Sequence, residues 1–151
     1  MSDLGSTFAI RRCMDSTRIL LVDDDDETRE LLRDFFGDRG YAVETAGDGA
    51  KAISRLNTFA ADVVITDLEM PGMSGLELIR LLHATHPECA VLLMTARAER
   101  EVPLQRLGQR AGFECLRKPL DLDTLEEMVE RVSGAHALQT LRPSMDDHPF
   151  G

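Results

Sequence analysis

Five short apolar runs recur along the chain, and four of them are followed by a longer segment in which apolar residues recur at helical spacing. Short runs rich in valine, isoleucine and leucine are typical of strands, whereas spacings of three and four residues are typical of helices with one buried face. Strands that alternate with helices predict a parallel sheet covered on both faces, because right-handed crossovers place successive helices against the sheet. The predicted strands are 19–22, 42–45, 63–66, 90–94 and 114–117.

Four of the predicted helices have a clear apolar face, and the helix before the fifth strand does not. Four apolar stripes mark them: Leu31, Leu32, Phe35 and Phe36; Ala50, Ile53 and Leu56; Leu78, Ile79, Leu81 and Leu82; Leu122, Leu125, Met128, Val129 and Val132. The helix before the fifth strand is predicted to be short and to begin near Pro103, because proline removes a helical hydrogen bond and Gly108 lowers helix propensity. For the last helix we predict an N-cap at Asp121 or Asp123, and a capping box if Asp123 pairs with Glu126.

The length and composition predict one folded domain. A chain of 151 residues with 43% hydrophobic content can bury one core of ordinary size. We expect this domain at 18–134, a flexible N-terminal extension at 1–17, and a C-terminal tail or linker at 135–151. The tail has no periodic apolar face, so it cannot make a second domain. The chain is therefore expected to act alone, or else to be the amino-terminal part of a longer protein with an effector domain.

Charge and cysteine usage exclude several classes of protein. The net charge of −10 argues against direct nucleic-acid binding, which needs a basic surface. No apolar stretch reaches the roughly 18 residues of a membrane helix, and no signal peptide is recognisable, so a cytoplasmic location is expected. Cys13, Cys89 and Cys115 show no CxxC spacing and are expected to be reduced. His83 and His86 lack a third ligand nearby, so no zinc site is predicted.

Polar residues follow four of the predicted strands at the point where each strand ends. Asp23 and Asp24 follow the first strand, Asp67 the third, Thr95 the fourth and Lys118 the fifth. The carboxyl ends of parallel strands share one edge of the sheet, where ligands bind. Three carboxylates brought together repel one another and require a cation, and oxygen ligands favour Mg²⁺. With the metal bound, Asp67 is a nucleophile that can form an aspartyl-phosphate, with Lys118 and Thr95 contacting the phosphoryl oxygens.

At these residues, 18–134 resembles the receiver domain of two-component response regulators. The motifs that carry the resemblance are Val22-Asp23-Asp24, the run from Asp67 to Gly75, Thr95-Ala96, and Lys118-Pro119, in the family's order and spacing. The resemblance implies a flavodoxin-like (βα)5 fold whose strands lie in the order 2-1-3-4-5. It also implies that the Lys118–Pro119 peptide bond is cis, an uncommon state for which the lysine's inward direction provides a reason.

The resemblance also implies roles for the site residues. Asp67 would accept a phosphoryl group from the phosphohistidine of a sensor histidine kinase or a histidine phosphotransfer protein. Asp24, Asp67 and the backbone carbonyl of Glu69 would bind Mg²⁺ directly, and Asp23 would hold a metal-bound water. The protein would signal by docking to a downstream protein after phosphorylation, and it would not be a turnover enzyme. A dimer formed on phosphorylation is left open.

Two positions bear on how such a receiver would switch and how long it would stay phosphorylated. The family usually has an aromatic residue three positions before the lysine, where this chain has Cys115. We therefore expect activation to involve the loops near Thr95 and the helix after Pro103 more than the fifth strand. Glu69 and Arg97 occupy positions that resemble those tuning phosphoryl lifetime in the family. They are expected either to pair over the site or to be an ordinary surface pair.

Two other classes fit less of the sequence. The DxDxT pattern at 24–28 suggests a haloacid-dehalogenase-type phosphatase. However, the chain lacks the acidic pair that this class has at the end of a strand after Lys118, and such a phosphatase would give Asp67 no role. A docking module that has lost phosphorylation is the other alternative, and the presence of all five chemical residues argues against it.

Overall fold

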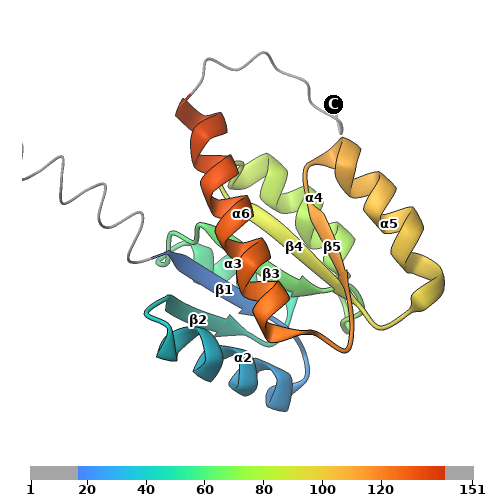
Figure 1. The fold of residues 1–151 in the computed structure, drawn as a ribbon, viewed down its shortest axis with the longest axis horizontal. Helices are drawn as coiled ribbons and strands as arrows, with labels where there is room; N and C mark the ends of the chain where they lie inside the picture. The colour runs from blue at the N-terminus through green and yellow to red at the C-terminus, as the bar shows by residue number, and fades with distance from the viewer. Residues whose placement is uncertain (1–16, 142–151) are drawn as a thin grey trace, which may run out of the picture.

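The computed structural model describes residues 17–141, which form one five-stranded sheet covered by helices (Figure 1). All strand pairings are parallel, and the strand order is β2-β1-β3-β4-β5. The predicted flavodoxin-like fold and strand order are therefore confirmed. Along the chain the elements are β1 Arg18–Val22, α2 Asp26–Asp38, β2 Ala42–Ala46, α3 Gly49–Leu56, β3 Val63–Asp67, α4 Gly75–Thr85, β4 Ala90–Thr95, α5 Ala98–Ala111, β5 Glu114–Arg117 and α6 Leu122–Leu141.

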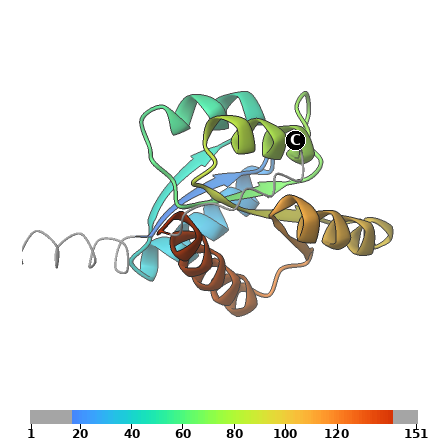
Figure 2. The ribbon, with the colours of Figure 1, turned by 90° about the horizontal axis from the view of Figure 1, so that it is seen from above.

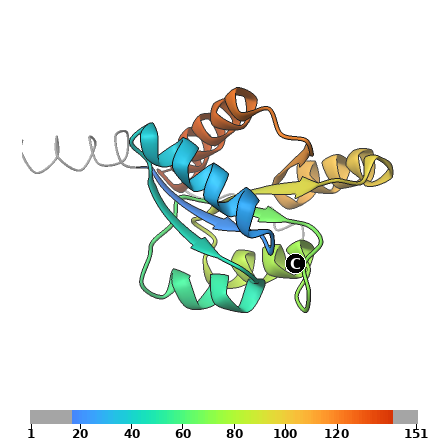
Figure 3. The same cartoon turned by 90° about the horizontal axis from the view of Figure 1, so that it is seen from below.

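Two apolar layers lie on opposite faces of the sheet. Alternate residues of a strand point to opposite faces, so Leu20 and Val22 of β1 join one core cluster while Ile19 and Leu21 join the other. Helices α2 and α6 cover the face of Ile19, and α3 and α4 cover the face of Leu20 (Figures 2 and 3). Helix α5 packs beside β5 and adds Leu104 to the apolar layer that contains Leu20. Burial on both faces explains why the apolar runs of β1, β3 and β4 are continuous rather than alternating, whereas the edge strands β2 and β5 are partly exposed.

The strand register brings the predicted site residues to one edge of the sheet. Val22 pairs with Thr66, so β1 and β3 end side by side. Asp67, the last residue of β3, pairs with Met94, which directly precedes Thr95 at the end of β4. Thr95 in turn pairs with Arg117, the last residue of β5, so β1, β3, β4 and β5 end together at the edge that carries the polar residues.

The helix before β5 is not short, and its predicted start at Pro103 is wrong. Helix α5 runs from Ala98 to Ala111 with Pro103 inside it. Proline deprives the carbonyl of Glu99 of its helical partner, but the side chains of Glu99 and Val102 are exposed, so water can reach this turn. The cost of the proline is therefore small compared with the packing of α5 on β4 and β5.

Gly108 has a packing role in the same helix rather than a purely weakening one. A Cβ added there would collide with the backbone oxygen of Phe113 and would lie 3.1 Å from its ring. The glycine thus lets α5 approach the chain that enters β5.

Three residues of the predicted apolar stripes are exposed, and one predicted cap is not formed. Leu31 and Leu81 are 56% and 41% exposed, and Ala50 also faces solvent. Helix α6 begins at Leu122, so Asp121 holds the cap position: its carbonyl accepts from the N–H of Leu125 at 2.9 Å, and its Oδ2 accepts from the Thr124 hydroxyl at 2.6 Å. The predicted Asp123–Glu126 capping box is wrong, because Asp123 lies inside the helix and the Glu126 carboxylate instead binds Arg39 and Tyr41, in the turn between α2 and β2. A tertiary ion pair thus replaced the local contact.

The expected domain at 18–134 lies within the described residues, whereas most of the expected N-terminal extension and part of the expected tail do not. The expected flexible extension, except for residue 17, and residues 142–151 of the tail are outside them. Helix α6 continues past Gly134 to Leu141, beyond the expected domain boundary. No helix in 17–141 combines the length and the apolar character needed to cross a membrane.

Candidate functional site

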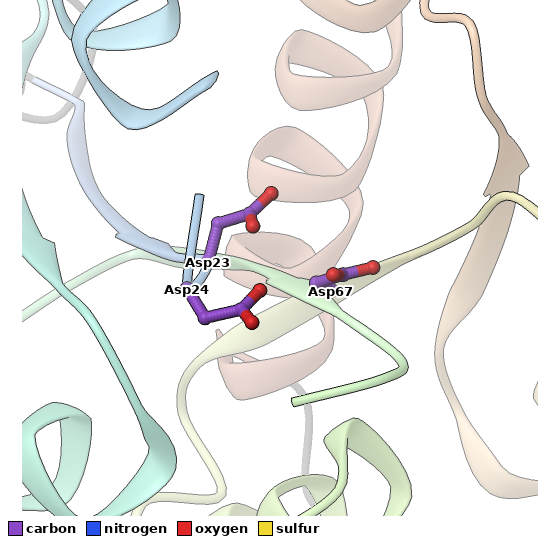
Figure 4. Close-up of side chains that lie close together, drawn as sticks. All are labelled: Asp23, Asp24 and Asp67. Carbon is purple, nitrogen blue, oxygen red and sulfur yellow. The ribbon is translucent and has the colours of Figure 1, made fainter. Parts of the chain in front are cut away.

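Three carboxylates meet at the carboxyl edge of the sheet (Figure 4). Asp23 and Asp24 follow β1, Asp67 ends β3, and one oxygen from each lies within 4.8 Å of the others. The Asp23 side chain is 2% exposed and that of Asp67 is 13% exposed, whereas Asp24 is open to solvent. Mutual repulsion of three such groups favours a bound cation, and an all-oxygen set fits a hard divalent ion.

Lys118 reaches this cluster from the end of β5. The Lys118–Pro119 bond is cis, as predicted. The backbone N–H of Lys118 donates to the carbonyl of Thr95 at 2.8 Å, which holds the end of β5 against β4. Its Nζ lies 3.2 Å from Asp23 Oδ2 and 3.5 Å from Asp67 Oδ1. Burial acts to lower the pKa of Lys118, but the two carboxylates outweigh it and raise this pKa, so the ammonium stays charged.

The environment of Asp67 makes its ionised form costly. Burial raises the pKa of Asp67 to about 6; the Lys118 ammonium lowers it, while Asp23 and Asp24 raise it. The pKa of this carboxyl, ordinarily 3.8, is thus raised to about 6 when no metal is bound.

Without divalent metal, Asp67→Asn is expected to stabilise the protein at pH 7 by about 1–2 kcal/mol. The shift from 3.8 to about 6 makes the folded state bind more protons than the unfolded state, so the Asp67 contribution to stability falls as pH rises through this window. Two pKa units represent roughly 3 kcal/mol. The expected gain is smaller because Asn leaves a polar group at the site and removes a partner of Lys118.

Urea unfolding of wild type and Asp67→Asn in EDTA, at pH 7.5 and near pH 4, measures this gain. The gain should be present at the higher pH and largely lost at the lower one. Equal stabilities at pH 7.5 would show that burial does not strain the Asp67 carboxylate.

Thr95 and the Glu69–Arg97 pair border the cluster. Thr95 is fully buried, and its Oγ1 accepts a hydrogen bond from the N–H of Arg97 at 3.1 Å, which leaves the hydroxyl proton available for another acceptor. Arg97 Nε lies 2.9 Å from Glu69 Oε2, so the expected pair forms, with both side chains about half exposed. This pair joins the loop after β3 to the loop after β4.

Cys115 lies on β5, three residues before Lys118. It is 7% exposed and is the register partner of Leu93. Burial, with a smaller contribution from Glu101, raises the pKa of the Cys115 thiol to about 11, so it is a neutral packing group. Beside it is a hollow of about 360 Å³ that Phe113 and Met128 also line. The expected effect of Cys115 on switching stays a prediction.

Two residues that shape this edge were not predicted from the sequence. Arg29 of α2 donates from Nη1 to the carbonyl of Asp23 at 2.5 Å. Gly75 begins α4 so close to the end of β3 that a Cβ there would overlap the Asp67 carbonyl and lie 2.8 Å from Leu93 Cδ1. The position of Arg29, about one helical turn after the acidic run from Asp23 to Glu27, was the feature of the sequence that could have indicated its role. Nothing local distinguishes Gly75 from an ordinary turn glycine.

Known proteins resemble this chain in sequence and in fold. The family model of the response regulator receiver domain matches residues 19–130. Regulatory protein AtoC of Escherichia coli (strain K12) is 36% identical over 115 residues, which are 76% of this chain and 24% of that protein. Response regulator MprA of Mycobacterium bovis is 38% identical over 118 residues, which are 78% of this chain and 49% of that protein.

A solved structure agrees with these matches. Response regulator protein TrrA of Thermotoga maritima, in complex with Mg²⁺ and BeF, superposes with a TM-score of 0.68 and 33% identity, covering 77% of this chain and 98% of that one. Because the family model covers more than half of the sequence and the fold agrees, the chain belongs to the response regulator receiver domain family.

Proposed function

We propose that the chain accepts a phosphoryl group on Asp67, in a Mg²⁺-dependent reaction, from the phosphohistidine of a sensor histidine kinase or histidine phosphotransfer protein. The observation that carries this proposal is the meeting of Asp67 with Asp23, Asp24 and Lys118 at one edge of the sheet. It is a phosphoacceptor that passes on a signal, and not an enzyme of steady turnover.

The residues at this edge fit Mg²⁺. Asp24 and Asp67 would bind the ion directly with the backbone carbonyl of Glu69, and Asp23 would hold one of its waters. Oxygen-only ligands and an exposed Asp24, which leaves room for water, suit an ion that keeps part of its hydration shell. When bound, the ion supplies positive charge that offsets the carboxylates and the phosphoryl oxygens. The TrrA complex with Mg²⁺ and BeF supports this assignment.

The side chains around Asp67 then do the remaining work. An Asp67 oxygen forms the new bond to phosphorus as the phosphorus–nitrogen bond of the donor histidine breaks, and the electron pair returns to the imidazole. Lys118 is close enough to neutralise a phosphoryl oxygen, and Thr95 has a proton to donate to another. Phosphoryl transfer needs such positioning and charge neutralisation more than covalent help.

The phosphatase alternative is not supported by the geometry. Asp26, the second acid of its DxDxT pattern, begins α2 and pairs with Arg29. The acids that meet are instead Asp23, Asp24 and Asp67.

The output of the signal is proposed at the level of a protein partner. The chain spans 24% of AtoC and 49% of MprA, so the relatives carry further sequence beyond the matched part. Either the receiver acts alone by docking, or it regulates an effector domain in a longer chain. A cytoplasmic location and a dimer formed on phosphorylation stay predictions.

The direct test is intact-mass measurement of the full chain after incubation with acetyl phosphate, with Mg²⁺ or with EDTA. We expect one added phosphoryl group only when Mg²⁺ is present. If the wild-type chain binds Mg²⁺ but gains no mass, the docking module without phosphorylation becomes the better account.

Arg97→Ala is expected to shorten the lifetime of the phosphorylated form by at most about fivefold, because a half-exposed ion pair contributes under about 1 kcal/mol. The Glu69–Arg97 pair joins two loops beside Asp67, and its loss should let water approach more often. The decay of phosphorylated protein after donor removal measures this rate. Arg106→Ala, on the exposed face of α5, is the matched control, and equal lifetimes in both variants would mean that the pair is only a surface contact.

A further inference from the structure

Asp23 is held at all four of its polar groups. It is 1% exposed, and its N–H donates to the carbonyl of Ala46 at 3.2 Å. Its Oδ1 accepts from the N–H of Asp25 at 2.9 Å, and its Oδ2 lies 3.2 Å from Lys118 Nζ. Its carbonyl oxygen accepts from Arg29 Nη1 at 2.5 Å. Of these four groups, the backbone carbonyl is the one that Arg29 binds.

Arg29 binds two acceptors at once, one just after β1 and one in the first turn of α2. Its Nη2 pairs with the Asp26 carboxylate while Nη1 holds the Asp23 carbonyl. The side chain is 20% exposed, and an added Cβ at Gly47 would lie 3.4 Å from Nη1. The guanidinium is therefore mostly buried, and its two terminal nitrogens link the end of β1 to the first turn of α2. A planar fork fixes the directions of both acceptors better than a flexible ammonium would.

The carbonyl that Arg29 holds belongs to the peptide that leads to Asp24. A peptide unit is planar, so fixing its oxygen also fixes the direction from Asp23 to the Cα of Asp24. Asp24 is exposed, and burial does not restrain its side chain. The orientation of this peptide therefore sets the position of the Asp24 Cα, from which its carboxylate comes within 4.8 Å of Asp67.

We propose that Arg29 is a positioning residue for the cation site: it orients the Asp23–Asp24 peptide so that the Asp24 carboxylate faces Asp67, and it thereby increases affinity for Mg²⁺. This inference rests on the proposed function of the site. The charge of Arg29 acts in the opposite direction, because a guanidinium repels a nearby cation. If orientation dominates, removing the Arg29 side chain should weaken Mg²⁺ binding; if charge dominates, removing it should strengthen Mg²⁺ binding.

Calorimetric titration of the metal-free full chain with MgCl₂ separates these effects. Arg29→Ala should raise the Kd for Mg²⁺ about tenfold, as when a partner that orients a metal ligand is removed. Arg29→Lys keeps the charge and one donor, and should recover part of the affinity. Asp26→Asn is the matched control: it removes the exposed ion pair but leaves the Arg29–Asp23 bond, and should change Kd less than about twofold.

Phosphoryl uptake from acetyl phosphate gives a second readout. In Arg29→Ala, the Mg²⁺ concentration for half-maximal rate should rise while the rate at saturating Mg²⁺ stays near that of wild type. A lower melting temperature with unchanged Kd would overturn the inference and leave Arg29 a purely structural residue. A tighter Kd would also overturn it, because only the charge would then matter.

The outcomes also separate this inference from the proposed function. If wild type binds Mg²⁺ but takes up no phosphoryl group, the proposed function fails, and the titration still decides the role of Arg29. If Arg29→Ala does not fold, Arg29→Gln replaces it, with the same expected rise in Kd. An unchanged Kd in Arg29→Gln would overturn the inference.

Discussion

Asp67→Asn is expected to abolish phosphoryl uptake from acetyl phosphate and Mg²⁺. Asn has no anionic oxygen to attack phosphorus, so the nucleophile itself is lost and not merely slowed. The substitution keeps the size of the side chain, and the metal-free variant is expected to be at least as stable as wild type at pH 7, so a failure to fold would not account for the loss. Intact-mass measurement after incubation with the donor shows the result directly.

Asp24→Asn is the matched control for this experiment. It removes one charge from the same cluster but leaves the Asp67 oxygen, so uptake should need more Mg²⁺ and still occur at high concentration. Stoichiometric uptake by the Asp67→Asn variant, on Asp24 or elsewhere, would show that the acceptor is wrongly assigned.

The sheet and its polar edge could be predicted because their signals are local and repeated. The buried strands β1, β3 and β4 show continuous apolar runs, and the polar residues at or just after the ends of β1, β3, β4 and β5 mark the same edge. Parallel pairing then brings Asp23, Asp67 and Lys118 together from positions far apart in sequence. No other information was needed to place a cation site at that edge.

The errors arose where tertiary contacts outweighed local preference. Pro103 predicted a late start for α5, but packing of the helix on β4 and β5 outweighs one missing hydrogen bond at an exposed turn. Glu126 suggested a local cap and instead binds Arg39, which follows the end of α2 and is far away in sequence. Leu31 completed an apolar stripe in the sequence and faces solvent in the fold, so spacing alone could not settle which edge of a helix is buried.

Gly75 shows the same limit at the site itself, and Gly75→Ala is expected to lower the free energy of unfolding by about 2–3 kcal/mol, the upper part of the usual range for overpacking. An added Cβ would overlap the Asp67 carbonyl and lie 2.9 Å from Leu68 Cα, and neither backbone atom can turn aside. The N–H of Gly75 also donates to the carbonyl of Leu68 at 2.8 Å, so α4 cannot withdraw without losing that bond. Urea unfolding of the full chain measures the loss.

Gly37→Ala is the matched control, because Gly37 lies in α2 and an added Cβ there meets nothing within 4 Å. Alanine at that helical position should be neutral or stabilising by up to about 1 kcal/mol. Relief of the overlap at Gly75 would move the loop between Asp67 and α4, so the Gly75→Ala variant should also need more Mg²⁺ for phosphoryl uptake. Equal stability of the two variants would mean that β3 and α4 separate easily enough to admit the added methyl group.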